Sequence, residues 1–124
     1  MVDLKKISLI VVVLCAPQSV MADDLFKTFA GCAARFSAAM EHAWLLGEDA
    51  QELTSSRGTF VSMLEATLPA DRSAEALNYR VAVKMAQATL LTTASFSDDA
   101  EKANRARQLS EQYLASCRRL LLDS

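Results

Sequence analysis

Cys32 and Cys117 are the residues whose chemistry the sequence defines best. A third cysteine, Cys15, lies in a segment that we expect to be removed, so an even pair remains. In an oxidising compartment, an even number of cysteines in a short chain is typical of a disulfide. Closing a loop of about 85 residues would contribute about 4 kcal/mol of stability in the chain-entropy model. We therefore predict a Cys32–Cys117 disulfide, with two buried free thiols as the alternative.

Met40 and His42 are the candidates for metal binding. Thioether and imidazole ligands favour copper(I), and Met63 and Met85 supply two further sulfur atoms. However, residues two apart on a helix point in directions about 200° apart, and methionine at helical spacing usually fills a core. We predict no metal site and no cofactor, and keep copper or other metal handling as an alternative function.

The sequence contains no pattern typical of an enzyme. His42 is the only histidine, and its position at the edge of an apolar helix face favours a partly exposed residue with a local hydrogen bond over a general base. The chain lacks the G-x-S-x-G turn of serine hydrolases, a phosphate-binding loop and a dinucleotide fingerprint. We predict a protein without catalytic residues or enzymatic activity. A small enzyme or an enzyme inhibitor is the second alternative.

Trp44 and Leu45 are the candidate contacts with a partner. They lie with Leu46 just before Gly47, where we expect a helix to end. At such a position an indole either forms an exposed apolar tip or packs over the mouth of a bundle. A large exposed apolar patch marks an interaction surface. The partner that we expect is another exported protein.

The first 22 residues are typical of a secretory signal peptide. Lys5 and Lys6 supply positive charge, residues 7–16 form an apolar run, and Val20-Met21-Ala22 provides a cleavage pattern. The apolar run is about half as long as a membrane-spanning helix, and Leu14 before Cys15 does not fit a lipoprotein signal. We predict a cleaved signal over residues 1–22 and a periplasmic or secreted location.

Residues 23–124 then form a single domain with no membrane span. Removal of Lys5, Lys6 and Asp3 leaves 11 basic and 14 acidic side chains, a formal net charge of −3. This balance excludes a polybasic nucleic-acid-binding protein. The apolar content is too high and too periodic for a disordered chain. The sequence does not specify an oligomeric state.

The pattern of apolar residues predicts an all-α fold. Glycine and proline are rare, with three and two residues respectively, and no stretch alternates apolar and polar residues for long enough to form a strand. Apolar side chains recur at three- and four-residue steps over about 24–46, 48–68, 73–94 and 98–122. Residues 54–58, which include Gly58, are the weakest helical segment, and a loop there is the alternative.

Short connections between these segments favour antiparallel neighbours. The first and last helices would then lie side by side, with Cys32 and Cys117 roughly 12 and 8 Å from the same end of the bundle. We predict a small up-down bundle of three to four helices, with the disulfide joining the first and last. The third segment, apolar on two faces, is expected to be the most buried. The function that we expect is that of a non-enzymatic accessory or binding protein in the periplasm.

Overall fold

A computed structural model describes residues 19–123 of the chain, and within this range it contains four helices and no strand. The helices are α1 (Ser19–Leu45), α2 (Gln51–Thr67), α3 (Ser73–Phe96) and α4 (Ala100–Leu122). The predicted all-α class is confirmed, and residues 54–58 are helical rather than a loop. Most of the predicted signal segment, residues 1–18, lies outside the described range.

Gly47 ends α1 as its position in the sequence predicts. Its φ of 71° lies in the left-handed region, where glycine avoids the clash that a Cβ would cause. The Gly47 N–H donates to the carbonyl of Trp44 at 3.1 Å, and the Glu48 N–H donates to that of Ala43 at 2.8 Å. These two bonds form a Schellman motif, which satisfies carbonyl groups at the helix end.

Asp99 is the N-cap of α4. The Asp99 carboxylate accepts hydrogen bonds from the backbone N–H groups of Glu101 and Lys102, at 3.1 and 3.2 Å. The sequence favours Asp98, because it stands three residues before Glu101 as in a capping box. Two consecutive aspartates leave this choice open in the sequence.

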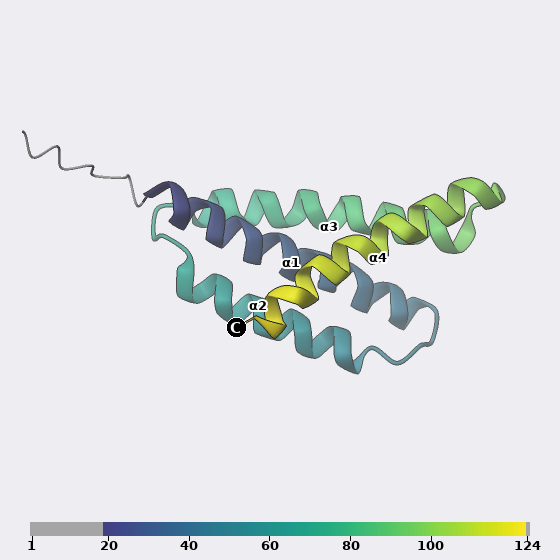
Figure 1. Cartoon of the computed structure of the whole chain (residues 1–124), viewed down its shortest axis with the longest axis horizontal. Helices are drawn as coiled ribbons and strands as arrows, with labels where there is room; N and C mark the ends of the chain where they lie inside the picture. The colour runs from purple at the N-terminus through teal and green to yellow at the C-terminus, as the bar shows by residue number, and fades with distance from the viewer. Residues whose placement is uncertain (1–18, 124) are drawn as a thin grey trace, which may run out of the picture.

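α1 is the central helix of the bundle. In Figure 1, α2 and α3 flank α1, and α4 crosses over it at an angle. α1 packs most extensively against α2 and α3, α4 packs mainly against α3, and the contact between α1 and α4 is short. Consecutive helices reverse direction, so the predicted up-down bundle is confirmed, but its outermost helices cross instead of running side by side.

The Cys32–Cys117 disulfide lies at this crossing. The two Cα atoms are 5.6 Å apart, which confirms the predicted link between the first and last helices. Cys32 lies near the middle of α1, whereas Cys117 lies in the last two turns of α4. Counted from Asp23, the first residue that we expect after cleavage, Cys32 lies nine positions along the chain, close to the expected depth; residues 19–22 extend α1 ahead of that point.

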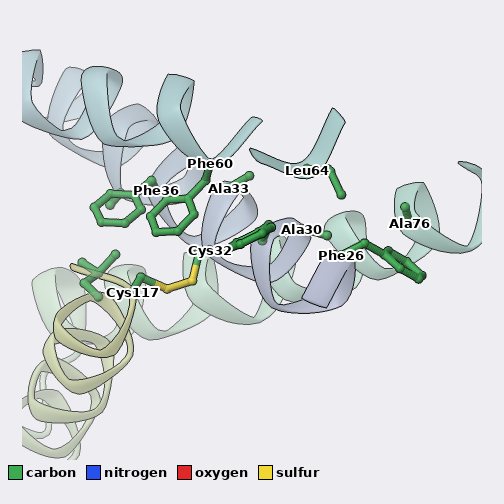
Figure 2. Close-up of a cluster of buried hydrophobic side chains, with 12 residues drawn as sticks. Phe26, Ala30, Cys32, Ala33, Phe36, Phe60, Leu64, Ala76 and Cys117 are labelled. Atoms are coloured by element: carbon green, nitrogen blue, oxygen red, sulfur yellow. A yellow bond between two sulfur atoms is a disulfide. The ribbon is translucent and has the colours of Figure 1, made fainter. Parts of the chain in front are cut away.

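The hydrophobic core surrounds α1. Phe36 of α1 and Phe60 of α2 are fully buried, and their rings stack with centroids 5.8 Å apart. Figure 2 shows both rings beside the disulfide. Buried alanines of α1 separate its large side chains and allow the neighbouring helices to approach closely. The cluster consists of Phe26, Phe29, Ala30, Cys32, Ala33, Phe36, Ala39, Phe60, Leu64, Ala76, Leu114 and Cys117.

α3 is not the most buried helix, contrary to the expectation from its sequence. Within α3, which is described throughout, only Ala76 and Gln87 are buried. Leu77, Val81 and Met85, which we expected to face the core, are 59%, 55% and 65% exposed. The reason is that α1 packs against three helices, whereas α3 packs mainly against α1 and α4 and leaves its remaining face exposed.

A buried hydrogen bond from Gln87 joins α3 to α4. Its Nε2 donates to the Oγ of Ser110 at 2.8 Å, in a buried position between the two helices. A buried amide without such a partner would be costly. This contact therefore fixes the register of α4 along α3.

Candidate functional site

An open face lies between α2 and α3, on a part of α1 that α4 does not cover. A pocket of 210 Å³ on this face is lined by residues from α1, α2 and α3, and its floor consists of the small residues Ala34 and Ser37. We define the open face as this pocket together with the exposed side chain of Met85. Its residues are Ala34, Ser37, Arg57, Leu77, Arg80, Val81, Lys84 and Met85.

A hydrogen bond and an ion pair hold two of the basic side chains of the open face, those of Arg57 and Lys84. The Arg57 Nε donates to the Ser37 Oγ at 2.7 Å, and the Lys84 Nζ lies 2.6 Å from the Glu41 Oε1. Both contacts run to α1. They therefore pull the long basic side chains toward the floor and leave the apolar side chains of α3 facing outward.

Trp44 and Leu45 are exposed at the C-terminal end of α1. They are 59% and 71% exposed, so they form an exposed tip and do not cover the mouth of the bundle. They follow Glu41 by three and four residues, which places them one turn beyond its ion pair with Lys84. That they contact a partner stays a prediction.

His42 makes a tertiary contact where the sequence suggested a local one. Its Nε2 lies 2.7 Å from the Oγ of Ser95 in α3, and its ring meets that of Phe96 edge-on at 6.1 Å between centroids. Glu48 and Glu111 line the same 270 Å³ pocket. Neither carboxylate bonds to the imidazole in the described part of the chain, so the pair lacks the third group that orients the base of a hydrolase triad.

The residues suggested for copper do not converge. Met40 is buried against Ala43 and Ala50, whereas His42 turns toward α3. Met63 packs against the main core, and Met85 is exposed on α3. Among residues 19–123, no group of three or more histidine, cysteine, aspartate or glutamate side chains could hold a metal ion. The arrangement therefore gives the metal-handling alternative no support.

A second pocket, of 670 Å³, lies where α4 crosses α1. We call it the crossing pocket. It is lined by Lys27, Thr28, Cys32, Arg35, Tyr79, Ser116, Cys117 and Leu120. Sequence reasoning missed this site because its residues come from three helices and share no motif. The one local signal was Gly31, a glycine inside a helix, beside which Arg35 and Tyr79 meet.

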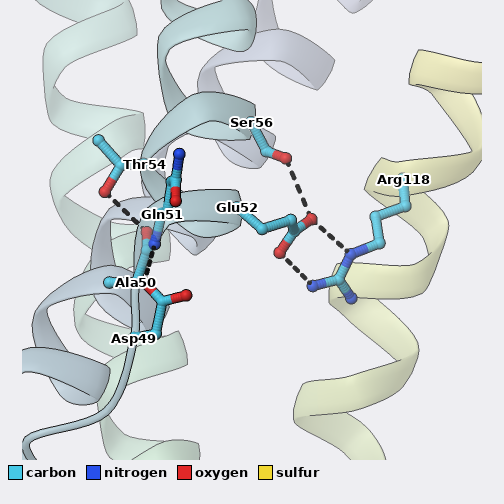
Figure 3. Close-up of polar contacts among 7 residues, drawn as sticks. All are labelled: Asp49, Ala50, Gln51, Glu52, Thr54, Ser56 and Arg118. Carbon is cyan, nitrogen blue, oxygen red and sulfur yellow. Dashed lines mark hydrogen bonds and ion pairs between the residues drawn. The ribbon is translucent and has the colours of Figure 1, made fainter.

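A bidentate ion pair joins the end of α4 to α2. The Nε and Nη2 of Arg118 donate to the two carboxylate oxygens of Glu52, each at 3.1 Å, and the Ser56 hydroxyl donates to Oε1 at 3.2 Å (Figure 3). The hydrogen bonds from Arg118 hold the pKa of the Glu52 carboxyl below its usual value. With the disulfide, this pair holds the last turns of α4 on two other helices.

No protein-family model matches the chain, and neither curated proteins nor solved structures show a match. The chain is a small helical bundle with a disulfide between its first and last helices and exposed apolar side chains on α3. None of the helices in the described range is long and apolar enough to cross a membrane. The disulfide is compatible with an extracellular or periplasmic protein.

Proposed function

We propose that this protein is a non-enzymatic binding protein that acts outside the cytoplasm. Its open face, with Trp44 and Leu45, receives an apolar segment of another exported protein. The observation that carries the proposal is the exposure of Leu77, Val81 and Met85, each more than half accessible to solvent. They stand four residues apart and so form one stripe along α3.

The exposed stripe has a thermodynamic consequence. Apolar surface in contact with water costs roughly 25 cal/mol for each Å² that a partner could cover. Single exposed apolar residues are common, but three in one stripe along a helix are typical of an interaction surface, and Trp44 adds an exposed indole at the end of α1. Trp44 suits a contact residue because it combines a large apolar area with few rotatable bonds.

Two features support a location outside the cytoplasm. A disulfide between Cys32 and Cys117 persists in an oxidising compartment and is rare in the cytosol. Residues 1–22 carry the basic, apolar and small-residue regions of a secretory signal. N-terminal sequencing of the protein recovered from the cell envelope or medium tests this part, with Asp23 as the expected first residue.

Site-specific photo-crosslinking tests the binding surface. A photoreactive side chain replaces Val81 or Leu45, and the matched control replaces Gln112, an exposed polar residue of α4. We expect one discrete crosslinked product at Val81 and Leu45 and none at Gln112. Equal labelling at all three positions, or no product at the two apolar positions, would contradict the proposal.

A further inference from the structure

The crossing angle of α4 creates a pocket that a parallel bundle would close. α3 and α4 lie together near their connection and then diverge as α4 passes over α1 toward α2 (Figure 1). The crossing pocket occupies this angle beside the disulfide. We propose that it binds the carboxylate or phosphate group of a small organic anion, with Arg35 as the main ligand.

Arg35 presents a positive charge without an acceptor. Its Cζ lies 4.8 Å from the centroid of the Tyr113 ring, a cation–π contact that holds the side chain in place. Among the residues that the structure describes, no oxygen accepts a hydrogen bond from its guanidinium. A guanidinium has five N–H donors in a planar fork, which matches the two oxygens of a carboxylate or phosphate. A half-buried arginine with free donors in a pocket is therefore suited to bind an oxyanion.

Gly31 leaves space for the Arg35 guanidinium above α1. A Cβ at this position would lie 3.2 Å from the Nη1 of Arg35 and 3.6 Å from the phenolic oxygen of Tyr79. The two polar groups therefore approach the same point above α1, where both reach one anion. Glycine inside a helix costs about 1 kcal/mol relative to alanine, and the approach of these two side chains gives a physical reason for its presence here.

The remaining lining residues define the kind of anion. The ammonium of Lys27 adds positive potential, although it also pairs with Glu75 at 3.0 Å. The hydroxyl groups of Thr28 and Ser116 are polar lining groups, while Leu120 and the disulfide form an apolar wall. Among the side chains that the structure describes, residues 25–123, no carboxylate lines the pocket. An inorganic ion has no apolar atoms to contact this wall. The ligand that fits therefore has an apolar part as well as an oxyanion.

Titration of the oxidised, ¹⁵N-labelled protein followed by NMR tests the proposal. The probes are benzoate and phenyl phosphate, and benzyl alcohol is the uncharged control. We expect saturable shifts at the amides of Gly31 and Tyr79 and at the Arg35 side chain with the anions, at millimolar concentrations. The tighter of the two anions identifies the preferred group. No saturable shift with either anion, or the same shifts with benzyl alcohol, would overturn the proposal.

Matched variants separate binding from folding. Arg35→Gln should weaken binding of the better probe by about tenfold or more, a difference readily measured by titration. Gly31→Ala should weaken binding while the midpoint of thermal unfolding stays equal or rises, because the flexible end of Arg35 can move aside. Gly58→Ala is the control: a Cβ there has no atom within 4 Å, so binding should not change.

Wild-type affinity in the Arg35→Gln variant would rule out the site. So would equal affinities in the Gly31→Ala and Gly58→Ala variants. The inference does not rest on the proposed function, because none of the variants touches the open face. Loss of anion binding and loss of the Val81 crosslink are therefore separate outcomes.

Discussion

α1 and α3 are both long and rich in apolar residues, but their side chains meet different surroundings. On α1, large and small apolar residues such as Phe36 and Ala33 are fully buried. On α3, side chains of similar character, such as Leu77 and Val81, face solvent. α1 contacts α2, α3 and α4, whereas α3 packs mainly against α1 and α4. The comparison teaches that burial in a small bundle depends on the number of neighbouring helices as much as on apolar content.

α1 and α3 also differ in how they are joined to α4. α1 is linked to α4 by the disulfide over a short crossing, and α3 is linked to it by extended packing and the buried Gln87–Ser110 hydrogen bond. Different changes should therefore weaken the two sides of the molecule. The comparison can be tested by substitution, by reduction and by pH.

The largest contrast is expected between Phe36→Ala and Val81→Ala. Removing a fully buried ring leaves a cavity and should lower the free energy of unfolding by about 4 kcal/mol. The same truncation at an exposed valine should cost less than about 0.5 kcal/mol. Urea denaturation monitored by circular dichroism measures both. Similar losses would show that the α3 stripe packs within the molecule, which would also remove the main support for the open face as a binding surface.

Breaking the disulfide should have the next largest effect. The bond closes a separation of 85 residues, so the Cys32→Ala/Cys117→Ala variant should lose up to about 4 kcal/mol of stability. Hydrogen exchange should then increase most in the last turns of α4 and little in α3. Thermal unfolding with and without reductant provides a second measure, and mass spectrometry should show that the oxidised chain lacks two hydrogens. Equal masses would exclude the bond.

The smallest expected effect is the pH dependence that arises from Glu52. Because the folded protein lowers the pKa of this carboxyl, the stabilisation is complete above the pKa of an unfolded glutamate, about 4.3. It is lost as the pH falls from there through the lower pKa of the folded state. The pair with Arg118 is largely exposed, so the effect should be at most about 1 kcal/mol. Unfolding curves between neutral pH and pH about 3 should show this loss in the wild type and a smaller one in Glu52→Gln. An unchanged slope in that variant would assign the pH dependence to other carboxyl groups.

The sequence was most informative where structure depends on neighbouring residues. The position of Gly47 predicted the end of α1, and the periodicity of apolar residues predicted all four helices. It was less informative where two neighbours had similar properties, as with Asp98 and Asp99. The pairing of Cys32 with Cys117 was predictable because, with Cys15 assigned to the signal segment, it left no other choice.

The candidate sites depend on contacts between helices, and the sequence predicted little of them. Trp44 and Leu45 were identified as an exposed tip or a cover of the bundle, and the structure was needed to choose between the two. The apolar stripe of α3 was taken for a core face because periodicity defines a face without defining what covers it. Arg35 and Tyr79 are 44 positions apart, and no local pattern connects them.

The residue types and their spacing alone determined the helical class, the end of α1 at Gly47 and the available sulfur pair. These properties follow from backbone hydrogen bonds and from side chains within one or two turns, which a linear pattern contains. Only the tertiary structure decided that α1 is central, that α4 crosses it at an angle and that α3 stays exposed. These properties arise from the simultaneous packing of four helices. Each helix has more than one apolar face that could pack against a neighbour.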